Sequence, residues 1–331
     1  MSRVVLCVRG GAGELPAVIG ALRYRGVEPI VLDSSVVPTA VPVTLVYEAG
    51  GLSLRWAHAS GGPGELRDVT AVWQAAVIGV ELPAMAPGVR ETCLAASERA
   101  AIGLLDSLGA FQLDPHHRQA RADRKPDQLR IARELGLDVP ATIISNDPEA
   151  VRAFARRTGR VVAKMLVPPV AAGPLSEGEA AVMFTTAMTE AELAALDGLD
   201  LCPMIFQEHI ARLRDVRVTV VGRRLFASVL DATPGDAADW RRASAAAEHA
   251  PVWQPYELPR EVAVRVVQLV DRAGLNYGAV DLVVRPDGRH AFLELNATGS
   301  FGFLGAEQTA AIAAAIAEVL LEPGARRVRH G

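Results

Sequence analysis

Residues 277–296, YGAVDLVVRPDGRHAFLELN, consist of two apolar runs on either side of Pro286-Asp287-Gly288. Proline and glycine at these positions favour a tight turn, so the stretch is predicted to form a β-hairpin. Residues 215–230, DVRVTVVGRRLFASVL, repeat the pattern around Gly222. The segment between them, residues 259–275, has the periodicity of an amphipathic helix. The last third of the chain is therefore predicted to alternate β-hairpins with helices.

The hairpin at 277–296 carries an unusual set of polar side chains. Pairing about its turn places Asp281 opposite Glu294, and alternation along the strand brings Asn296 to the same face. By the same alternation, Leu293 and Leu295 face the core. Two carboxylates directly across a hairpin repel each other unless a positive group lies between them, and Mg²⁺ accepts such a set of oxygen ligands. The pattern favours a magnesium site over an acidic hairpin neutralised by solvent or arginine.

The preceding hairpin supplies positive charge. In RDVRVTVV, residues 214–221, Asp215 and Arg217 share one face and three valines take the other. Arg241 follows Trp240 in a long loop, where an anion could order it. These arginines are candidates for binding a phosphate or carboxylate near the predicted metal site.

Only two of the 34 basic residues are lysines, Lys125 and Lys164. Lysine is a compact charge on a slim stem, whereas arginine is a wide planar fork. A tight nucleotide pocket is one setting that requires the slimmer group, and a solvated surface is the alternative. Neither lysine follows a phosphate-binding GxxxxG loop, so a Walker-type site is excluded.

The chain begins with a strand at 3–8, a glycine turn leading into a helix, and a second strand that ends at Asp33. This order is typical of a doubly wound α/β domain. It also suggests a dinucleotide site with Asp33 on a ribose. Gly11 and Gly13 fit that fingerprint, but Pro16 stands where the third glycine is required.

The middle of the chain is predicted to start with a polar connection, residues 111–125, in which His116 and His117 are loop residues. Amphipathic helices follow within 126–142 and 145–159, the second with Asp147 as N-cap. A strand at 160–167 contains Lys164. A further helix begins with a capping box from Thr189 to Glu192.

Composition excludes several classes of protein. A length of 331 residues suggests about two domains. A net charge of −4 and a pI near 6.0 argue against a nucleic-acid-binding protein. The longest apolar stretch, residues 309–321, is too short to span a bilayer and contains Glu318. Cys7, Cys93 and Cys202 fit no metal or disulfide spacing, so we expect reduced thiols in a cytoplasmic protein with no membrane partner.

Taken together, these pieces resemble the ATP-grasp carboxylate ligases, and in detail the ATP-grasp maturases of ribosomal peptides, the microviridin-type or graspetide synthetases. The resemblance rests on residues 115–321, with DWRR at 239–242 between the two hairpins. It implies an α/β (α+β grasp) fold in which an N-terminal doubly wound pre-ATP-grasp domain precedes a two-lobed ATP-grasp domain. The expected boundaries are 1–114 for the N-terminal domain, 115–205 for the small lobe and 206–325 for the C-terminal lobe with the metal site.

The resemblance also implies roles for individual residues. Lys125 and Lys164 stand where the family binds the α and β phosphates of ATP. Asp281, Glu294 and Asn296 match the Mg²⁺ ligands. Arg217 and Arg241 match arginines that hold the γ-phosphate and the acyl phosphate, and Asp215 is the candidate general base. The remaining nucleotide-binding positions are Gln207, Glu208, Ile210 and Leu293, the first three along the adenine.

The implied reaction has two steps. A carboxylate attacks the γ-phosphorus of ATP to give an acyl phosphate, and a hydroxyl or amine then displaces phosphate. The expected substrate is a ribosomal precursor peptide with a leader and an acidic core, which Arg118, Arg121 and Arg124 could help to bind. A homodimer is expected because such synthetases are commonly dimers. The bond formed, ester or amide, stays open.

Three alternatives remain. The enzyme could be an ATP-grasp ligase of free amino acids or another small carboxylate, a non-catalytic ATP-binding module, or a nicotinamide oxidoreductase that uses the glycine turn. The sequence also departs from the maturase pattern, since Gly299 is followed by Ser300 and Phe301 where the family usually has glutamine and tryptophan. Another departure is the lack of a double glycine in the flap after Lys164. These departures affect peptide recognition more than the nucleotide site.

Overall fold

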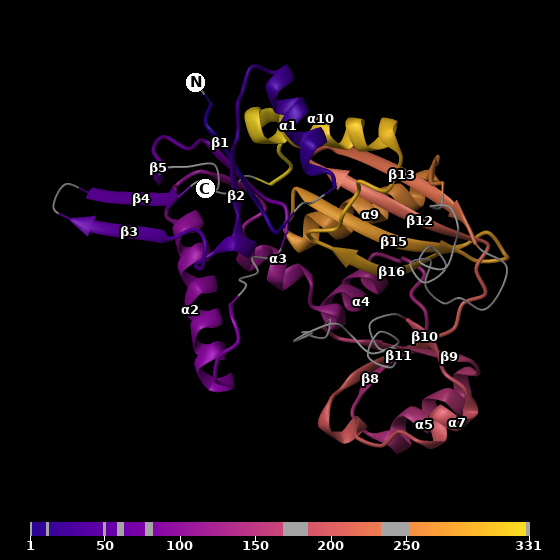
Figure 1. The fold of residues 1–331 in the computed structure, drawn as a ribbon. Helices are drawn as coiled ribbons and strands as arrows, with labels where there is room; N and C mark the ends of the chain where they lie inside the picture. Colours follow the sequence, from indigo (N-terminus) through magenta and orange to yellow (C-terminus); the bar gives the residue numbers. More distant parts are fainter. Residues whose placement is uncertain are drawn as a thin grey trace.

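The computed structural model describes residues 2–10, 13–48, 51–57, 63–76, 82–167, 185–232 and 252–328. Three groups of elements follow one another along the chain (Figure 1). A parallel sheet with its helices comes first, a small antiparallel sheet with two helices follows, and a larger antiparallel sheet completes the fold. This mixed α/β architecture agrees with the predicted fold class, while the residue boundaries proposed for its domains stay predictions.

The first sheet has the strand order β2-β1-β6-β7, and all its neighbouring strands are parallel. Its strands are β1 (Val4–Val8), β2 (Ile30–Asp33), β6 (Ala71–Gln74) and β7 (Phe111–Leu113). Helix α1 (Leu15–Tyr24) links β1 to β2, as the glycine turn and apolar pattern predicted. Helix α2 (Pro87–Asp106) precedes β7. The predicted doubly wound opening is confirmed.

A three-stranded antiparallel sheet lies between β2 and β6 in the sequence and was not predicted. It contains β3 (Val43–Glu48), β4 (Gly51–Ala57) and β5 (Pro63–Glu65). Figure 1 shows β3 and β4 extending away from the rest of the molecule, next to α2.

The connection predicted as a loop is helical. Helix α3 (His116–Ala122) contains both His116 and His117 and is followed by α4 (Lys125–Glu134). The prediction gave too much weight to the polarity of this stretch. Its arginine, glutamine and alanine residues are good helix formers, and burial of Gln119 and Ala122 holds the helix in place.

The small antiparallel sheet has the order β10-β9-β11-β8. Its strands are β8 (Thr142–Ser145), β9 (Val161–Met165), β10 (Thr186–Ala187) and β11 (Met204–Glu208). Helices α5 (Pro148–Thr158) and α7 (Glu190–Ala194) begin at the predicted caps. The Asp147 side chain accepts from the Glu149 N–H, and Thr189 and Glu192 form the predicted capping box.

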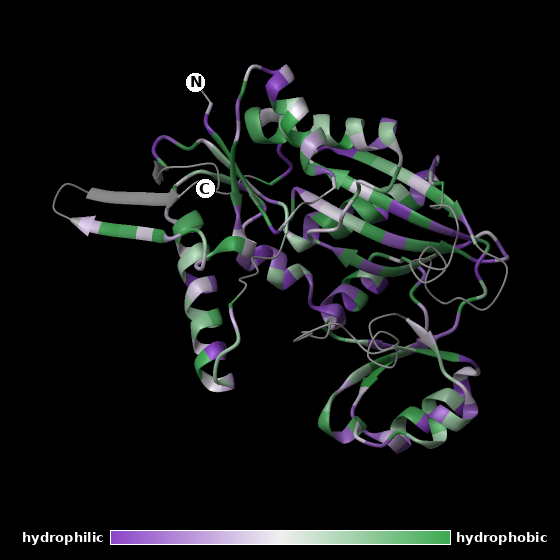
Figure 2. Ribbon diagram, viewed as in Figure 1, coloured by the Kyte–Doolittle hydropathy of each residue, from purple (hydrophilic) through white to green (hydrophobic). Residues whose placement is uncertain are grey.

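The larger sheet has the order β14-β13-β12-β15-β16. It contains β12 (Arg214–Val221), β13 (Arg224–Asp231), β14 (Gln254–Pro255), β15 (Tyr277–Val284) and β16 (His290–Asn296). Helix α9 (Arg260–Ala273) packs on one face, where Val266, Leu269 and Val270 join Val216, Val218 and Val220 in one apolar core. Both predicted hairpins are confirmed, and the hydrophobic colouring of Figure 2 follows these strands.

The last helix, α10 (Ala306–Leu321), packs against elements from the beginning of the chain. Its Ile312, Ile316 and Leu320 share a core with Leu6 of β1 and Leu22 of α1. The buried carboxylate of Asp114, just after β7, forms a second connection, between the parallel sheet and the larger sheet. It accepts from the backbone N–H groups of Asn276 and Tyr277, at 2.7 and 2.8 Å. The parallel sheet is thereby attached to the start of β15, the strand that contains Asp281.

None of the helices in the described part of the chain is both long and apolar enough to cross a membrane.

Candidate functional site

Four polar residues that pair directly across neighbouring strands form a row on the larger sheet. Ser228 of β13 pairs with Arg217 of β12, Arg217 pairs with Asp281 of β15, and Asp281 pairs with Glu294 of β16. Directly paired residues of neighbouring strands point to the same face. This row therefore lies on the face opposite the valines that pack against α9. The predicted metal ligands and the predicted phosphate-binding Arg217 thus belong to one constellation.

The pairing of Asp281 with Glu294 depends on a β-bulge that the sequence analysis did not foresee. Near the turn Leu282 pairs with Phe292, but the next pair along is Asp281 with Glu294, so Leu293 is the extra residue. The turn takes up three residues rather than two, because the Arg285 N–H donates to the Arg289 carbonyl. Without the bulge, this turn would place Leu293 opposite Asp281. The bulge restores the facing carboxylates.

The same bulge corrects the prediction for Leu293. Alternation assigned both Leu293 and Leu295 to the core, but only Leu295 is buried there. Leu293 is half-buried. An apolar side chain displaced from the core beside Glu294 is consistent with the nucleotide-binding position that the family resemblance gave it, which stays a prediction.

Each carboxylate of the site has a cationic neighbour. Arg217 Nε lies 3.2 Å from Asp281 Oδ1, and Lys125 Nζ lies 2.9 Å from Glu294 Oε2. The Asn296 amide donates to both, at 3.3 Å to Asp281 and 3.1 Å to Glu294. Lys125 is the first residue of α4, where a positive charge is unfavourable for the helix dipole. Its contact with Glu294 offsets that effect.

The second lysine, Lys164 on β9 of the small sheet, also acts on the Glu294 carboxylate. Lys164 Nζ donates to Gln207 Oε1 at 3.0 Å across β9 and β11. Burial alone would raise the pKa of the Glu294 carboxyl, but the charges of Lys125 and Lys164 lower it well below its ordinary value. The two lysines are far apart in the sequence and both act on Glu294. The structure therefore places both lysines within electrostatic reach of one carboxylate, while their role in binding phosphate stays a prediction.

The donor set fits Mg²⁺. Two carboxylates and one amide from adjacent strands supply oxygen ligands, which is how this ion is held when water and phosphate take its other positions. In this structure Lys125 and Arg217 neutralise the two carboxylates, and a bound cation could take over that role. Among the described residues no three His, Cys, Asp or Glu side chains gather as a metal group. The predicted set therefore needs the Asn296 amide oxygen as its third ligand.

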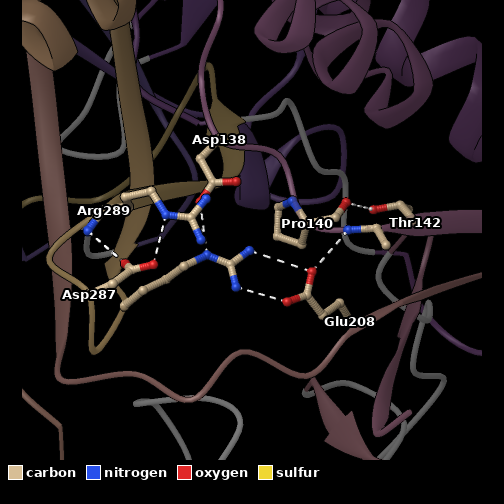
Figure 3. A network of polar contacts seen from close by, with 8 residues as sticks. Asp138, Pro140, Thr142, Glu208, Asp287 and Arg289 are labelled. Atoms are coloured by element: carbon tan, nitrogen blue, oxygen red, sulfur yellow. Dashed lines mark hydrogen bonds and ion pairs between the residues drawn. The ribbon is translucent and has the colours of Figure 1, made fainter. Parts of the chain in front are cut away.

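The predicted adenine segment lies at the end of β11. Gln207 is buried and bonds Lys164 and the Thr142 hydroxyl. Glu208 uses its carboxylate differently, because Arg285 contacts it at 2.8 Å and the Ala141 N–H at 3.2 Å (Figure 3). Its side chain is therefore committed to joining the β15–β16 turn to the small sheet. Adenine recognition by the backbone of Glu208 and Ile210 stays a prediction.

Two other predicted residues have different outcomes. Asp215 is buried on the same face of β12 as Arg217, but Arg212 Nη1 lies 3.0 Å from its carboxylate. This ion pair already engages the Asp215 carboxylate, and its role as general base stays a prediction. Arg241 and most of the flap after Lys164 lie outside the described residues.

Sequence reasoning missed Gln128, which is 3% exposed on α4. Its Nε2 donates to the Leu295 carbonyl at 2.7 Å, and its Oε1 accepts from the Leu295 N–H at 3.0 Å. Leu295 lies between Glu294 and Asn296 on the edge strand β16. Gln128 therefore positions both ligands relative to Lys125, which lies one helical turn earlier. A glutamine on the apolar face of a predicted helix was the available signal.

The remaining polar motifs have structural roles. Asp33 accepts from the Gly10 N–H and from both the N–H and the hydroxyl of Ser35, so it stabilises the glycine turn. This disfavours the dinucleotide alternative, which required Asp33 for a ribose. Arg118 donates to the Gly274 carbonyl at the end of α9. Arg121 and Arg124 are exposed and leave the predicted peptide-binding role open.

Known proteins share this arrangement. Residues 12–120 match the family described as MvdD pre-ATP grasp domain. Among solved structures, the macrocyclase MdnC of Microcystis aeruginosa MRC, bound with precursor peptide MdnA, is 34% identical over 97% of this chain and 99% of that chain, with a TM-score of 0.83. A RiPP-associated ATP-grasp ligase of Chryseobacterium gregarium, in complex with ADP and a leader and core peptide, is 25% identical over the full length of both chains, with a TM-score of 0.85.

The ATP-grasp ligase PsnB, complexed with a phosphomimetic variant of minimal precursor, Mg and ADP, is 25% identical over 97% of this chain and 98% of that chain, with a TM-score of 0.67. Among curated protein sequences, no relative was found. Each of these three structures contains a peptide, the latter two contain ADP, and that of PsnB also contains Mg.

Proposed function

The chain belongs to the ATP-grasp macrocyclases of ribosomal peptides, and from this premise we propose which groups it uses and on what substrate. It is an ATP-dependent ligase that works with ATP and Mg²⁺. Its substrate is a ribosomal precursor peptide, whose side-chain carboxylates it activates as acyl phosphates and joins to hydroxyl or amine side chains. The observation that carries the proposal is the convergence of Lys125, Lys164 and Arg217 on the carboxylates of Asp281 and Glu294.

In the first step, an oxygen of the peptide carboxylate attacks the γ-phosphorus of ATP, and ADP leaves. Lys125 and Lys164 bind the α and β phosphates, where a slim ammonium group fits between phosphate oxygens. Arg217 holds the transferred phosphoryl group, because its buried Nη1 has no hydrogen-bond partner among the described residues. Asp281, Glu294 and Asn296 would hold Mg²⁺, whose positive charge would neutralise the phosphate oxygens.

In the second step, a hydroxyl or amine of the peptide attacks the acyl carbon, and phosphate leaves with the electron pair of the broken bond. Neither step needs a nucleophile from the protein. The protein contributes fixed positive charge and orientation, which are the main requirements of phosphoryl and acyl transfer.

A peptide substrate is favoured over a free amino acid or another small carboxylate. The similar solved structures of MdnC, PsnB and the Chryseobacterium gregarium ligase contain precursor peptides. Arg121 and Arg124 are exposed next to Lys125 and are suited to an acidic core. Arg118 already donates to the Gly274 carbonyl, so it is the less suited of the three arginines.

We also propose that the enzyme is a cytoplasmic homodimer. The extension made by α2 and β3–β4 exposes Tyr47 and Val89, which a second copy could cover. The three cysteines are free thiols, as expected in a reducing compartment. Light scattering on the purified protein measures the mass, and a monomeric mass would disprove the dimer.

The test of the proposed function begins with calorimetric titration of ATP, with and without Mg²⁺, into wild type and Lys164→Met. Binding should require Mg²⁺ and weaken at least tenfold in the variant. Arg133→Met, which removes an exposed charge from α4, is the matched control and should bind as wild type does. Acid-rich candidate peptides are then incubated with enzyme and Mg·ATP, and mass spectrometry should find one water lost per link. Normal ATP binding without loss of water from any peptide would refute the peptide assignment.

A further inference from the structure

The turn before α1 and the segment after Asn296 contact each other, and neither has a role in the site described above. Glu14 belongs to the glycine turn before α1, and Ser300 belongs to the segment after Asn296 that departs from the family pattern. The Ser300 hydroxyl donates to Glu14 Oε2 at 3.0 Å. Gly302 packs against the same residue, since a Cβ atom there would lie 3.2 Å from both the backbone nitrogen and Oε2 of Glu14. The N-terminal domain thus places a carboxylate against the segment that follows the metal ligands.

Glu14 is a buried carboxylate that forms no ion pair with the described residues. It is 6% exposed, and Ser300 is its only hydrogen-bond donor within the described parts of the chain, which offer it no ion pair. It occupies the N-cap position of α1 but makes no capping bond with its side chain. Buried polar groups usually have hydrogen-bond partners, and a carboxylate with a single donor can accept a further hydrogen bond from a substrate.

The segment 299–302, which contacts Glu14, also contacts the candidate site. A Cβ atom at Gly299 would lie 3.3 Å from Arg217 Nη1 and 3.2 Å from the Asn296 Cβ. The Tyr277 hydroxyl donates to the Gly299 carbonyl. Burial raises the pKa of this hydroxyl, while the charge of Arg217 lowers it and that of Glu14 raises it. Arg217 and Glu14 therefore both lie within electrostatic reach of the Tyr277 hydroxyl.

We propose that Glu14 is the proton acceptor for the attacking side chain in the second step. This inference rests on the proposed function, in which Arg217 holds the activated carboxylate. The acceptor hydroxyl or neutral amine donates a hydrogen bond to the Glu14 carboxylate. As its oxygen or nitrogen forms the bond to the acyl carbon, the bond from that carbon to the phosphate oxygen breaks. The proton passes to Glu14, and phosphate leaves.

Asp215, the base expected from the sequence, is less suited to this task. Its carboxylate is paired with Arg212 at 3.0 Å, whereas no ion pair engages Glu14 among the described residues. A carboxylate that no ion pair engages can accept a hydrogen bond and a proton from a substrate group. Ser300 has a supporting role, because its hydroxyl orients one carboxylate oxygen and leaves the other for the substrate.

The test separates the two steps with hydroxylamine, a small nucleophile that captures an acyl phosphate as a hydroxamate. The variants are Glu14→Gln, Glu14→Asp and Ser300→Ala, with Glu28→Gln as control, since Glu28 is an exposed carboxylate of the same domain. The substrate is a peptide that the wild type links in the mass assay. Calorimetry with Mg·ADP verifies that each variant is folded with an intact nucleotide site.

For Glu14→Gln we expect Mg·ADP affinity and hydroxamate formation within about twofold of wild type, while linking falls by about 10²- to 10⁴-fold. Glu14→Asp, which keeps the carboxylate, should recover part of the linking, and Ser300→Ala should lose less than Glu14→Gln. Linking by Glu14→Gln near the wild-type rate would overturn the inference, as would a parallel fall in hydroxamate. If the wild type forms no hydroxamate from any peptide, the proposed function fails, and this inference with it.

Discussion

Lys125 Nζ lies 2.9 Å from Glu294 Oε2, so in the free protein a lysine of α4 neutralises a predicted metal ligand of β16. Arg217 has the same relationship with Asp281 on the adjacent strand. The two carboxylates tolerate each other across the hairpin because each has a cation of its own. Binding of Mg·ATP would exchange these partners, with the metal taking the carboxylates and the cations taking the phosphates.

Lys125→Met should therefore destabilise the nucleotide-free protein. Removal of the ammonium leaves Glu294 facing Asp281 with less compensation, at a cost of about 1–3 kcal/mol. Thermal unfolding with and without Mg²⁺, in the absence of nucleotide, measures this effect. Mg²⁺ should raise the melting temperature of the variant more than that of wild type, because in wild type Lys125 competes with the metal for Glu294. An equal increase in both proteins would contradict the exchange of partners.

Gln128→Leu should weaken metal-dependent nucleotide binding. The substitution removes both hydrogen bonds to Leu295 and one to the Ala122 carbonyl, so about 3 kcal/mol of stability should be lost. Because Leu295 lies between two ligands, the Mg²⁺ concentration needed for half-maximal ADP binding should also rise. Gln119→Leu is the control, since Gln119 is equally buried but bonds the Gln74 carbonyl away from the site. A loss of stability alone, as in the control, would limit Gln128 to a structural role.

Asp114→Asn should loosen the attachment of the parallel sheet to β15. An amide nitrogen in place of either oxygen would face an N–H donor of Asn276 or Tyr277, and both positions are buried. We expect about 2–4 kcal/mol of lost stability in urea unfolding. Asp106→Asn, at the end of α2, is the comparison, because among the described residues its carboxylate accepts only from the Gln112 side chain. Equal effects of the two substitutions would argue against a special role of Asp114 in attaching the parallel sheet to β15.

Glu208 should make stability depend on pH. Its hydrogen bond with Arg285 lowers the pKa of the carboxyl in the folded state below the ordinary value of about 4.3. The resulting stability is fully present above that value and is lost as the pH falls through the folded-state pKa. Urea unfolding should show wild type about 1 kcal/mol more stable than Glu208→Gln near neutral pH, with a smaller difference in acid.

The same substitution in an Arg285→Met background provides the control. Without the guanidinium, the stability difference that Glu208→Gln causes should vary little with pH, because the main cause of the pKa shift is gone. A pH dependence that persists there would assign the effect to another group.

The sequence predicted the elements of the second half well, because periodicity, caps and turn residues act locally. The caps at Asp147 and Thr189 and both hairpins were found this way. The facing of Asp281 and Glu294 was also correct, although the reasoning assumed a two-residue turn. A longer turn and the bulge at Leu293 cancel, and neither is encoded by hydrophobic alternation.

The residues that were missed act through long-range contacts. Gln128 and Leu295 are distant in the sequence, as are Glu14 and Ser300, so no local pattern relates them. The partner of Asp215 illustrates the same limit, because strand alternation places a side chain on a face but does not identify its neighbours. Polarity also misled at His116, where burial of Gln119 and Ala122 favours a helix.

The contacts at the edge of β16 restrict how a peptide can approach. Gln128 binds both backbone groups of Leu295, and the Phe292 N–H donates to the Asp138 carbonyl at 2.7 Å. Many peptide-binding proteins add their ligand to such an edge as an extra strand. Here those backbone groups are already occupied, so β-augmentation beside the metal ligands is blocked. A peptide carboxylate would therefore reach the metal ligands over the face of the sheet, not along the edge of β16.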